Sequence, residues 1–285
     1  LETFQGISTL SKNKTFLAKL GQTSKVSGFF LITSILWITF YTIFSINNLK
    51  PFDINKNFLF GFGINYNKTT ELALRYMDSK GITGNIFNSF HIEQYISWRD
   101  FPKRSPFIDG RGTNPDIFEK ALTARQSRMI MSDLVKEYGF EVFLFDYSNL
   151  ETMKSEIFSD KDAFLSSKDW ALVYWDDFSL VYLLRGGKYQ HVINEDEYRT
   201  LKPANAIANI SYLIQDREYM QRVVEELKRN INTTGSSRAY ALLGSIYSRI
   251  GLYSEALDIL RKVRDFGDPY YMVLKYDSLG IASIG

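Results

Sequence analysis

A long apolar run near the N-terminus dominates the hydrophobic pattern of this chain. Residues 26–49 contain no charged side chain, and residues 28–46 are interrupted mainly by Thr and Ser. At a rise of about 1.5 Å per residue, the shorter stretch would form a helix about 28 Å long, close to the roughly 30 Å hydrocarbon thickness of a bilayer. Thr and Ser hydroxyls can bond back to a helix backbone, so they do not oppose insertion. The pattern predicts a transmembrane helix over residues 26–49, with a buried core helix as the alternative.

The charges that flank this run predict its orientation. Four lysines precede it and three follow within a similar distance: Lys12, Lys14, Lys19 and Lys25 before it, and Lys50, Lys56 and Lys68 after it. Because cytoplasmic loops carry an excess of Lys and Arg, this bias favours a cytoplasmic N-terminus, with residues 1–25 as a basic segment beside anionic lipid. The sequence begins at Leu1 without an initiator Met, so we expect a longer protein with further spans upstream.

Beyond the apolar run, helical and extended patterns alternate. The pattern predicts helices over residues 69–80 and 115–138, and strands over residues 85–88, 106–109, 140–146, 171–175 and 178–184. Residues 140–146 form a nearly continuous apolar run, which is typical of a strand buried on both faces. The last two strands are predicted to form a hairpin that turns at Asp176-Asp177. Together these elements predict a small α/β layer domain over residues 57–190.

Residues 200–285 lose the strand pattern and become helical. Within them lies a regular series of aromatic, small and large apolar residues: Tyr240, Leu243, Gly244, Tyr247, Gly251, Tyr253, Ala256 and Leu260. This series resembles a tetratricopeptide repeat, in which two helices approach each other closely at small residues. The resemblance implies either a groove for a protein or peptide partner, or a pair of helices that only packs against the rest of the chain.

Composition narrows the chemistry that the chain can support. The 285 residues carry 34 Lys and Arg against 32 Asp and Glu, and this near balance argues against a nucleic-acid partner. With no Cys and only two His, a metal site or a thiol nucleophile is not expected. His91 and Glu93 could face one side of an extended strand, although their spacing alone fixes no contact. Asp176-Asp177 could bind a cation, although adjacent acids more often make a turn.

The segment over residues 61–111 carries a recognisable series. Its members are Gly84, Phe87, Asn88, Tyr95, Ile96, Trp98, Pro102, Phe107, Ile108, Asp109, Gly110 and Arg111. This series resembles the extramembrane tail of bacterial polytopic glycosyltransferase-like proteins, a multi-span family that uses lipid-phosphate-linked sugars. The chain departs from that family at four positions, where the family has an Asp, a Trp and a pair of Gly: Ser89, Ile92, Glu93 and Gln94.

The resemblance implies that the chain is the C-terminal part of a bacterial inner-membrane protein, with its catalytic acids upstream. It further implies that the extramembrane part lies outside the cytoplasm. There it would support or position the acceptor for sugar transfer from a lipid-linked donor, and no cofactor is expected. The candidate ligand-binding residues are Asn88, Tyr95, Trp98, Asp109 and Arg111. Asp109 and Arg111 could hold a sugar hydroxyl or a phosphate, although an internal ion pair is the simpler explanation.

The predicted fold class is a membrane-anchored α+β protein with one transmembrane helix, a small α/β layer domain and a C-terminal tetratricopeptide-like helical region. The first hypothesis for its function is a non-catalytic tail of a glycosyltransferase-like protein. The alternative is a membrane-anchored adaptor whose repeat groove recruits partner proteins. The predicted partners are the lipid bilayer, a protein or peptide at the groove, and a lipid-linked sugar bound through upstream spans.

Overall fold

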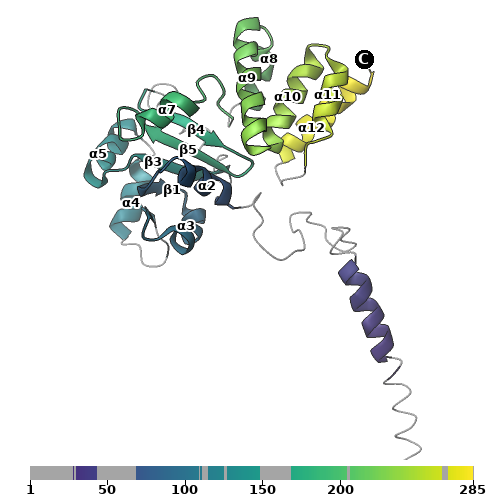
Figure 1. Ribbon diagram of the computed structural model, residues 1–285, viewed down its shortest axis with the longest axis horizontal. Coiled ribbons are helices and arrows are strands. Elements are labelled where there is room, and N and C mark those ends of the chain that lie inside the picture. Colours follow the sequence, from purple (N-terminus) through teal and green to yellow (C-terminus); the bar gives the residue numbers. More distant parts are fainter. Residues whose placement is uncertain are drawn as a thin grey trace, which may run out of the picture. The chain divides into compact units, whose positions relative to one another are not determined.

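The computed structural model of the chain is shown in Figure 1. It describes residues 28, 30–43, 69–108, 110, 115–124, 127–147, 168–203, 206–264 and 269–284. These residues form an α+β fold. The chain divides into two compact units, Leu1–Gly63 and Ile64–Gly285.

The first unit contributes one described helix, at residues 28 and 30–43. Thr33 and Thr42 donate hydrogen bonds to the carbonyl oxygens of Phe30 and Ile38, as expected for hydroxyls in an apolar helix. Among the described residues, no helix is long and apolar enough to cross a membrane. The prediction of a transmembrane helix over residues 26–49, and with it the membrane-anchored fold class, is therefore wrong; residues 44–49 lie outside the described residues.

The second unit is built on a five-stranded mixed sheet with the order β2-β1-β3-β5-β4. Its strands are β1 (Gly84–Asn88), β2 (Arg104–Pro106), β3 (Val142–Asp146), β4 (Trp170–Trp175) and β5 (Ser179–Leu184). β1 pairs in parallel with both β2 and β3, whereas β5 pairs antiparallel with β3 and β4. The hairpin predicted to turn at Asp176-Asp177 is therefore present as β4 and β5.

Helices cover both faces of this sheet. On one face, Val142 and Leu144 of β3 share a core with α2 (Glu71–Ser79), α3 (Glu93–Asp100) and α7 (Gln190–Asp196). On the other face, Phe143 and Phe145 share a core with α4 (Pro115–Ala124), α5 (Arg128–Tyr138) and the C-terminal helices. All five residues of β3 are buried, which confirms the strand buried on both faces that the apolar run predicts.

Three local predictions need correction. Residues 115–138 form two helices instead of one, because Ser127 adopts extended backbone angles and interrupts them. The strand predicted over residues 106–109 lies earlier, where Arg104 pairs with Gly84 and Pro106 with Ile86. Residues 90–92 form a 3₁₀ turn and α3 begins at Glu93, so His91 and Glu93 do not share a strand.

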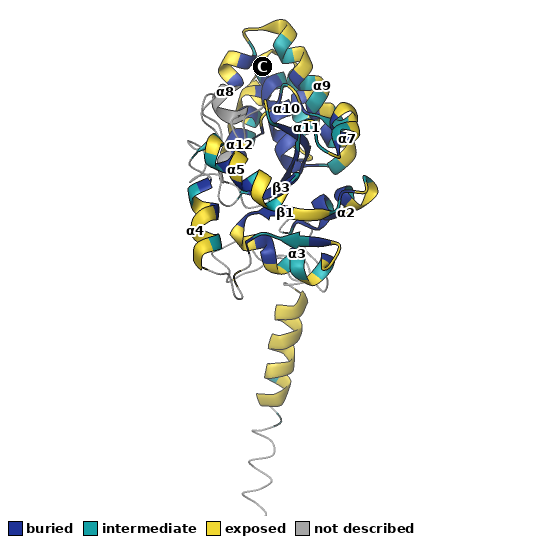
Figure 2. Ribbon diagram, turned by 90° about the vertical axis from the view of Figure 1, so that its left-hand side faces the viewer, coloured by how far each residue is buried: buried dark blue, intermediate teal, exposed yellow. Residues whose placement is uncertain are grey.

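The C-terminal helices are α8 (Ala206–Leu213), α9 (Arg217–Thr234), α10 (Ser237–Arg249), α11 (Tyr253–Leu260) and α12 (Pro269–Ile284). Figure 2 shows that α10 is buried along most of its length. A Cβ atom at Gly244 would lie 2.5 Å from Cγ of Leu260, so α10 and α11 approach each other closely at this glycine. Gly251 has a φ of +83°, which suits glycine at the turn between these two helices.

The other members of the repeat-like series also pack within the helical region. Leu243, Ala256 and Leu260 are buried, and Tyr240, Tyr247 and Tyr253 pack against the same core as partly buried side chains. These residues thus contribute to the packing of α10 and α11 with each other and with the sheet-facing core. That packing does not by itself establish a tetratricopeptide repeat.

Candidate functional site at the carboxyl edge of the sheet

The strand order singles out one edge of the sheet. Because β1, β2 and β3 are parallel, their carboxyl ends meet at the same edge. The chain passes from β1 to β2 through α3 on one face, and from β2 to β3 through α4 and α5 on the other face. The winding direction therefore reverses around β1. In α/β sheets, ligands bind outside the carboxyl ends of strands at such a reversal.

Asn88 ends β1 at this edge and is fully buried. Its Oδ1 accepts hydrogen bonds from the backbone N–H groups of Phe107 (2.9 Å) and Ile108 (3.3 Å). Its Nδ2 donates to the carbonyl oxygens of Ser89 (2.9 Å) and Ile108 (3.2 Å). Two bonds to the amide oxygen and two from the amide nitrogen use the ordinary capacity of an Asn side chain. The structure thus assigns Asn88 to holding the end of β1 against the chain that leaves β2.

Asp146 ends β3 beside Asn88 and is 1% exposed. Its backbone N–H donates to Oγ of Ser89 (3.0 Å), and the N–H of Ser89 donates to the carbonyl oxygen of Leu144 (3.2 Å). Ser89 therefore joins the carboxyl ends of β1 and β3. The sequence analysis did not select Asp146, although an acid directly after an apolar strand is a signal that could have found it.

Glu93 begins α3 close to the same edge and is 3% exposed. Its Oε1 lies 3.2 Å from where a Cβ atom would stand at Gly110, and the ring of Phe90 lies equally close to that point. Within the part of the chain that the structure describes, the Glu93 carboxylate forms no hydrogen bond or ion pair. His91 is exposed while Glu93 is buried, so the two do not make the pair considered from their spacing.

The turn between β4 and β5 lies at this edge too, because Asp146 pairs with Ser179. Oδ1 of Asp176 accepts the N–H groups of Phe178 (2.7 Å) and Ser179 (2.6 Å), and Oδ2 accepts the hydroxyl of Tyr174 (2.7 Å). Burial raises the pKa of Asp176 to about 6, despite these hydrogen bonds. Asp176 therefore shapes the turn.

Asp177 connects the same turn to α10. Its carboxylate accepts the hydroxyl of Ser236 (2.7 Å) and the N–H groups of Ser237 (3.0 Å) and Arg238 (2.9 Å). The guanidinium of Arg238 lies 3.8 Å from the ring centroid of Tyr147 and 4.7 Å from that of Tyr271. An acid at a helix N-terminus satisfies N–H groups that have no partner within the helix. The Asp177 carboxylate thus fixes the helical region to the sheet.

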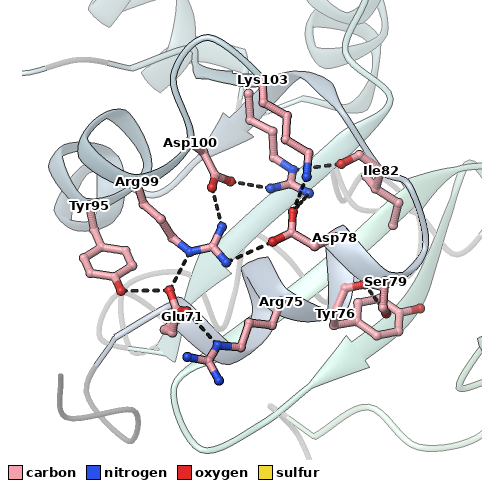
Figure 3. A network of polar contacts seen from close by, with 11 residues as sticks. Glu71, Arg75, Tyr76, Asp78, Ser79, Ile82, Tyr95, Arg99, Asp100 and Lys103 are labelled. Carbon is pink, nitrogen blue, oxygen red and sulfur yellow. Dashed lines mark hydrogen bonds and ion pairs between the residues drawn. The ribbon is translucent and has the colours of Figure 1, made fainter.

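Two of the predicted ligand-binding residues lie elsewhere. Tyr95 donates its hydroxyl to Oε2 of Glu71 (2.9 Å), within a network of charged side chains that joins α2, α3 and the start of β2 (Figure 3). Trp98, in the same helix, is 73% exposed, and its ring centroid lies 5.6 Å from that of Tyr95. Asp109 and Arg111 lie outside the described residues.

In the network of Figure 3, each buried charged side chain contacts a side chain of opposite charge. Its acids are Glu71, Asp78 and Asp100, and its cations are Arg75, Arg99, Lys103 and Arg104. Arg104 is fully buried and also donates from Nε to the carbonyl oxygen of Ile82 (2.8 Å), just before β1. Burial alone would raise the pKa of Asp78, but hydrogen bonds from Lys103, Arg104 and Arg99 hold it well below its usual range. This network stabilises the amino edge of the sheet.

The described residues contain no group of three or more His, Cys, Asp or Glu side chains that could hold a metal ion. No family model, curated protein or solved structure matches the chain. The resemblances to glycosyltransferase-like proteins and to tetratricopeptide repeats therefore find no support in these comparisons. The geometry of the carboxyl edge is the remaining guide to function.

Proposed function

We propose that this chain is a non-catalytic binding module of a glycosyltransferase-like protein, and that the carboxyl edge of β1, β2 and β3 holds the acceptor for sugar transfer. The observation that carries this proposal is the reversal of winding at β1, with the buried polar side chains of Asn88, Ser89, Glu93 and Asp146 gathered beside it. Polar groups buried at the carboxyl ends of parallel strands are what a ligand site of this fold class requires.

A supporting role fits these residues better than a catalytic one. The Asn88 amide is occupied by backbone groups of residues 107–108, and Oγ of Ser89 accepts the N–H of Asp146. His91 is exposed and makes a ring contact with Phe90. A nucleophile needs a base within hydrogen-bond reach, and Ser89 and His91 show no such contact with each other among the described residues. The resemblance likewise places the catalytic acids upstream of this chain.

The proposal is tested by hydrogen–deuterium exchange of the full chain with a panel of acceptor analogues. The panel contains neutral sugars, amino sugars and short peptides with Ser, Thr or Asn. At least one compound should slow exchange at residues 86–93 and 144–147, where the strand ends meet. Slower exchange confined to other parts of the chain, or no change with any compound, would overturn the proposal.

The second candidate function is recruitment of a protein or peptide by the helical region. It is favoured by the exposed apolar side chains of α12, where Val273, Tyr276 and Ile284 are 68%, 63% and 89% exposed. Scattered exposed apolar residues are common, but several on one helix are consistent with a contact surface. Peptide binding that Tyr276→Asp abolishes, with no change in exchange at the carboxyl edge, would favour this candidate over the first.

A further inference from the structure

Helix α12 presents an apolar face to solvent. Val273, Tyr276 and Ile284 are 68%, 63% and 89% exposed, and Gly280 lies between the last two. Spacings of three, four and four residues place all four positions on one side of the helix. The other side packs within the helical region, beside α10 and α11 (Figure 1), through four buried residues: Tyr271, Leu274, Ser278 and Ala282.

The same chain shows what fits on a face of this kind. Helix α10 contains the series Tyr-Ala-Leu-Leu-Gly, which ends at Gly244, and α12 contains Tyr-Asp-Ser-Leu-Gly, which ends at Gly280. At Gly244 helix α11 lies against α10, and a Cβ atom there would be 2.5 Å from Cγ of Leu260. A Cβ atom at Gly280 would meet nothing outside its own helix within 4 Å among the described residues. The face of α12 therefore has the features that receive a helix in α10, and no described residue covers it at the glycine.

The charges of α12 do not oppose the pairing of this face with an identical one. The helix carries two charged side chains, Lys275 and Asp277. Nζ of Lys275 donates to the carbonyl oxygen of Val263 (2.7 Å), and the carboxylate of Asp277 lies 3.5 Å from Arg249. Since each charge has a partner within its own copy, two copies of the face would not repel each other. The face also offers no net charge that would select an acidic or a basic partner.

The positions of the apolar side chains suit a two-fold interface. Tyr276 and Ile284 lie four residues before and four residues after Gly280. When two α12 helices cross antiparallel at Gly280, Tyr276 of each copy lies opposite Ile284 of the other. The same patch then complements itself, as a two-fold dimer requires. Rows of residues four apart interdigitate in the commonest class of helix packing, and a glycine at the crossing lets the two backbones approach closely.

We propose that this face of α12 binds a second copy of the chain, with the two helices antiparallel and crossing at Gly280. The inference goes beyond the proposed function at the carboxyl edge, and it names a partner for the surface on which the second candidate function rests. A helix of 16 residues is about 24 Å long, so its face is smaller than the roughly 800 Å² per partner of a standard interface. The dimer should therefore be weak, with a dissociation constant of about 10–100 µM.

Disulfide cross-linking tests the geometry, because the chain contains no Cys of its own. Gly280→Cys introduces one thiol at the crossing point. Under mild oxidation it should cross-link two copies at least about tenfold faster than Tyr212→Cys, because the dimer holds the two thiols at a high effective concentration. Tyr212 is a suitable control, since it is 73% exposed on α8 and lies outside the face. In an antiparallel dimer, Tyr276→Cys mixed with Ile284→Cys should cross-link faster than either variant alone.

Sedimentation velocity of the full chain measures the association itself. Gly280→Lys places a long side chain and a charge at the crossing, where the two copies would repel each other, so association should weaken at least about tenfold. Its melting temperature should stay the same or rise, because lysine is a better helix former than glycine. Tyr276→Asp should also weaken association, by burying an unpaired charge in the interface. Tyr212→Asp is the matched control and should change nothing.

Three results would overturn the inference. These are a monomer at all concentrations up to about 500 µM, association that neither Gly280→Lys nor Tyr276→Asp weakens, and cross-linking of Gly280→Cys no faster than that of Tyr212→Cys. Association through the apolar helix at residues 30–43 would give the second and third of these results. The proposed function fails separately, because it requires only that an acceptor analogue slows exchange at residues 86–93 and 144–147.

Discussion

Helix α3 carries a buried acid at each end, and the two acids have opposite surroundings. Asp100, at the C-terminal end, is ion-paired with Arg99 and Arg104. Glu93, at the N-terminal end, is buried to a similar extent and has no hydrogen bond or ion pair among the described residues. One end of the helix lies at the amino edge of the sheet and the other near its carboxyl edge.

This contrast separates stabilisation from binding. Where an acid is buried with partners, as at Asp100, removing one partner leaves an uncompensated charge, so the pair acts as a structural unit. Where an acid is buried without such partners, as at Glu93, its removal leaves no opposite charge uncompensated, so we expect the fold to depend on it less. Glu93 is then available to the ligand edge that we propose.

The largest effect is expected at the paired end. Arg104→Met removes the guanidinium that contacts Asp100, Asp78 and the carbonyl oxygen of Ile82, while it keeps much of the side-chain volume. The free energy of unfolding in urea should fall by about 3–5 kcal/mol, because Asp100 remains buried with fewer partners.

The control for this variant is Arg75→Gln. Arg75 is 55% exposed and pairs with Glu71 one helical turn away, so its loss should cost less than about 1 kcal/mol. If Arg104→Met lowered the free energy of unfolding no more than Arg75→Gln, the network would not stabilise the amino edge. Asp100 would then no longer be a structural acid, and it would not differ from Glu93.

A second prediction concerns how folding stability changes with pH through one acid at each edge of the sheet. Burial raises the pKa of Asp176 to about 6, above the roughly 3.9 of an unfolded chain, so the folded state binds this proton more tightly. The stability that Asp176 contributes is therefore full below about pH 4 and is lost as the pH rises to about 6. Asp78 has the opposite sign, because its lowered pKa makes its contribution disappear as the pH falls below about 4.

Asp176→Asn keeps an Oδ1 acceptor for the turn and removes the titration. Between about pH 4 and 6, wild-type stability relative to this variant should fall by on the order of 2 kcal/mol. Urea unfolding at a series of pH values measures the difference, with Asp133→Asn on the exposed face of α5 as the control. A constant difference across this range would show that Asp176 does not titrate there.

The sequence predicts helices and strands better than it predicts which side chains contact each other. The apolar run of β3 and the end of α5 at Gly139, which has a φ of +67°, follow from local patterns and are confirmed. The apolar run near the N-terminus is equally local, yet the transmembrane helix that it predicts is wrong, because no helix among the described residues is long and apolar enough to cross a membrane. Asp146 could have been selected as a candidate site residue from the sequence, because it comes at the end of an apolar strand.

The difference between Glu93 and Asp100 could not be predicted in the same way. The sequence places Arg99, Lys103 and Arg104 within four residues of Asp100 and no Lys or Arg that near to Glu93, but it does not show that both acids are buried. Arg104 also pairs with Asp78 of α2, which lies 26 residues earlier in the chain. That pairing is set by tertiary structure, so the full network emerges from the coordinates and not from a motif.

The smallest expected effect is also the sharpest test of the comparison. Glu93→Gln replaces an unpartnered buried charge with a neutral group of the same shape, so stability should stay unchanged or rise by up to about 1 kcal/mol. Asp100→Asn is the matched variant at the other end of α3 and should be destabilising, because Arg99 and Arg104 lose the charge that they contact. Urea midpoints with an unchanged slope would measure both. If Glu93→Gln lost as much stability as Asp100→Asn, then Glu93 would also be a structural acid, and the carboxyl edge would no longer differ from the amino edge in the way a ligand site requires.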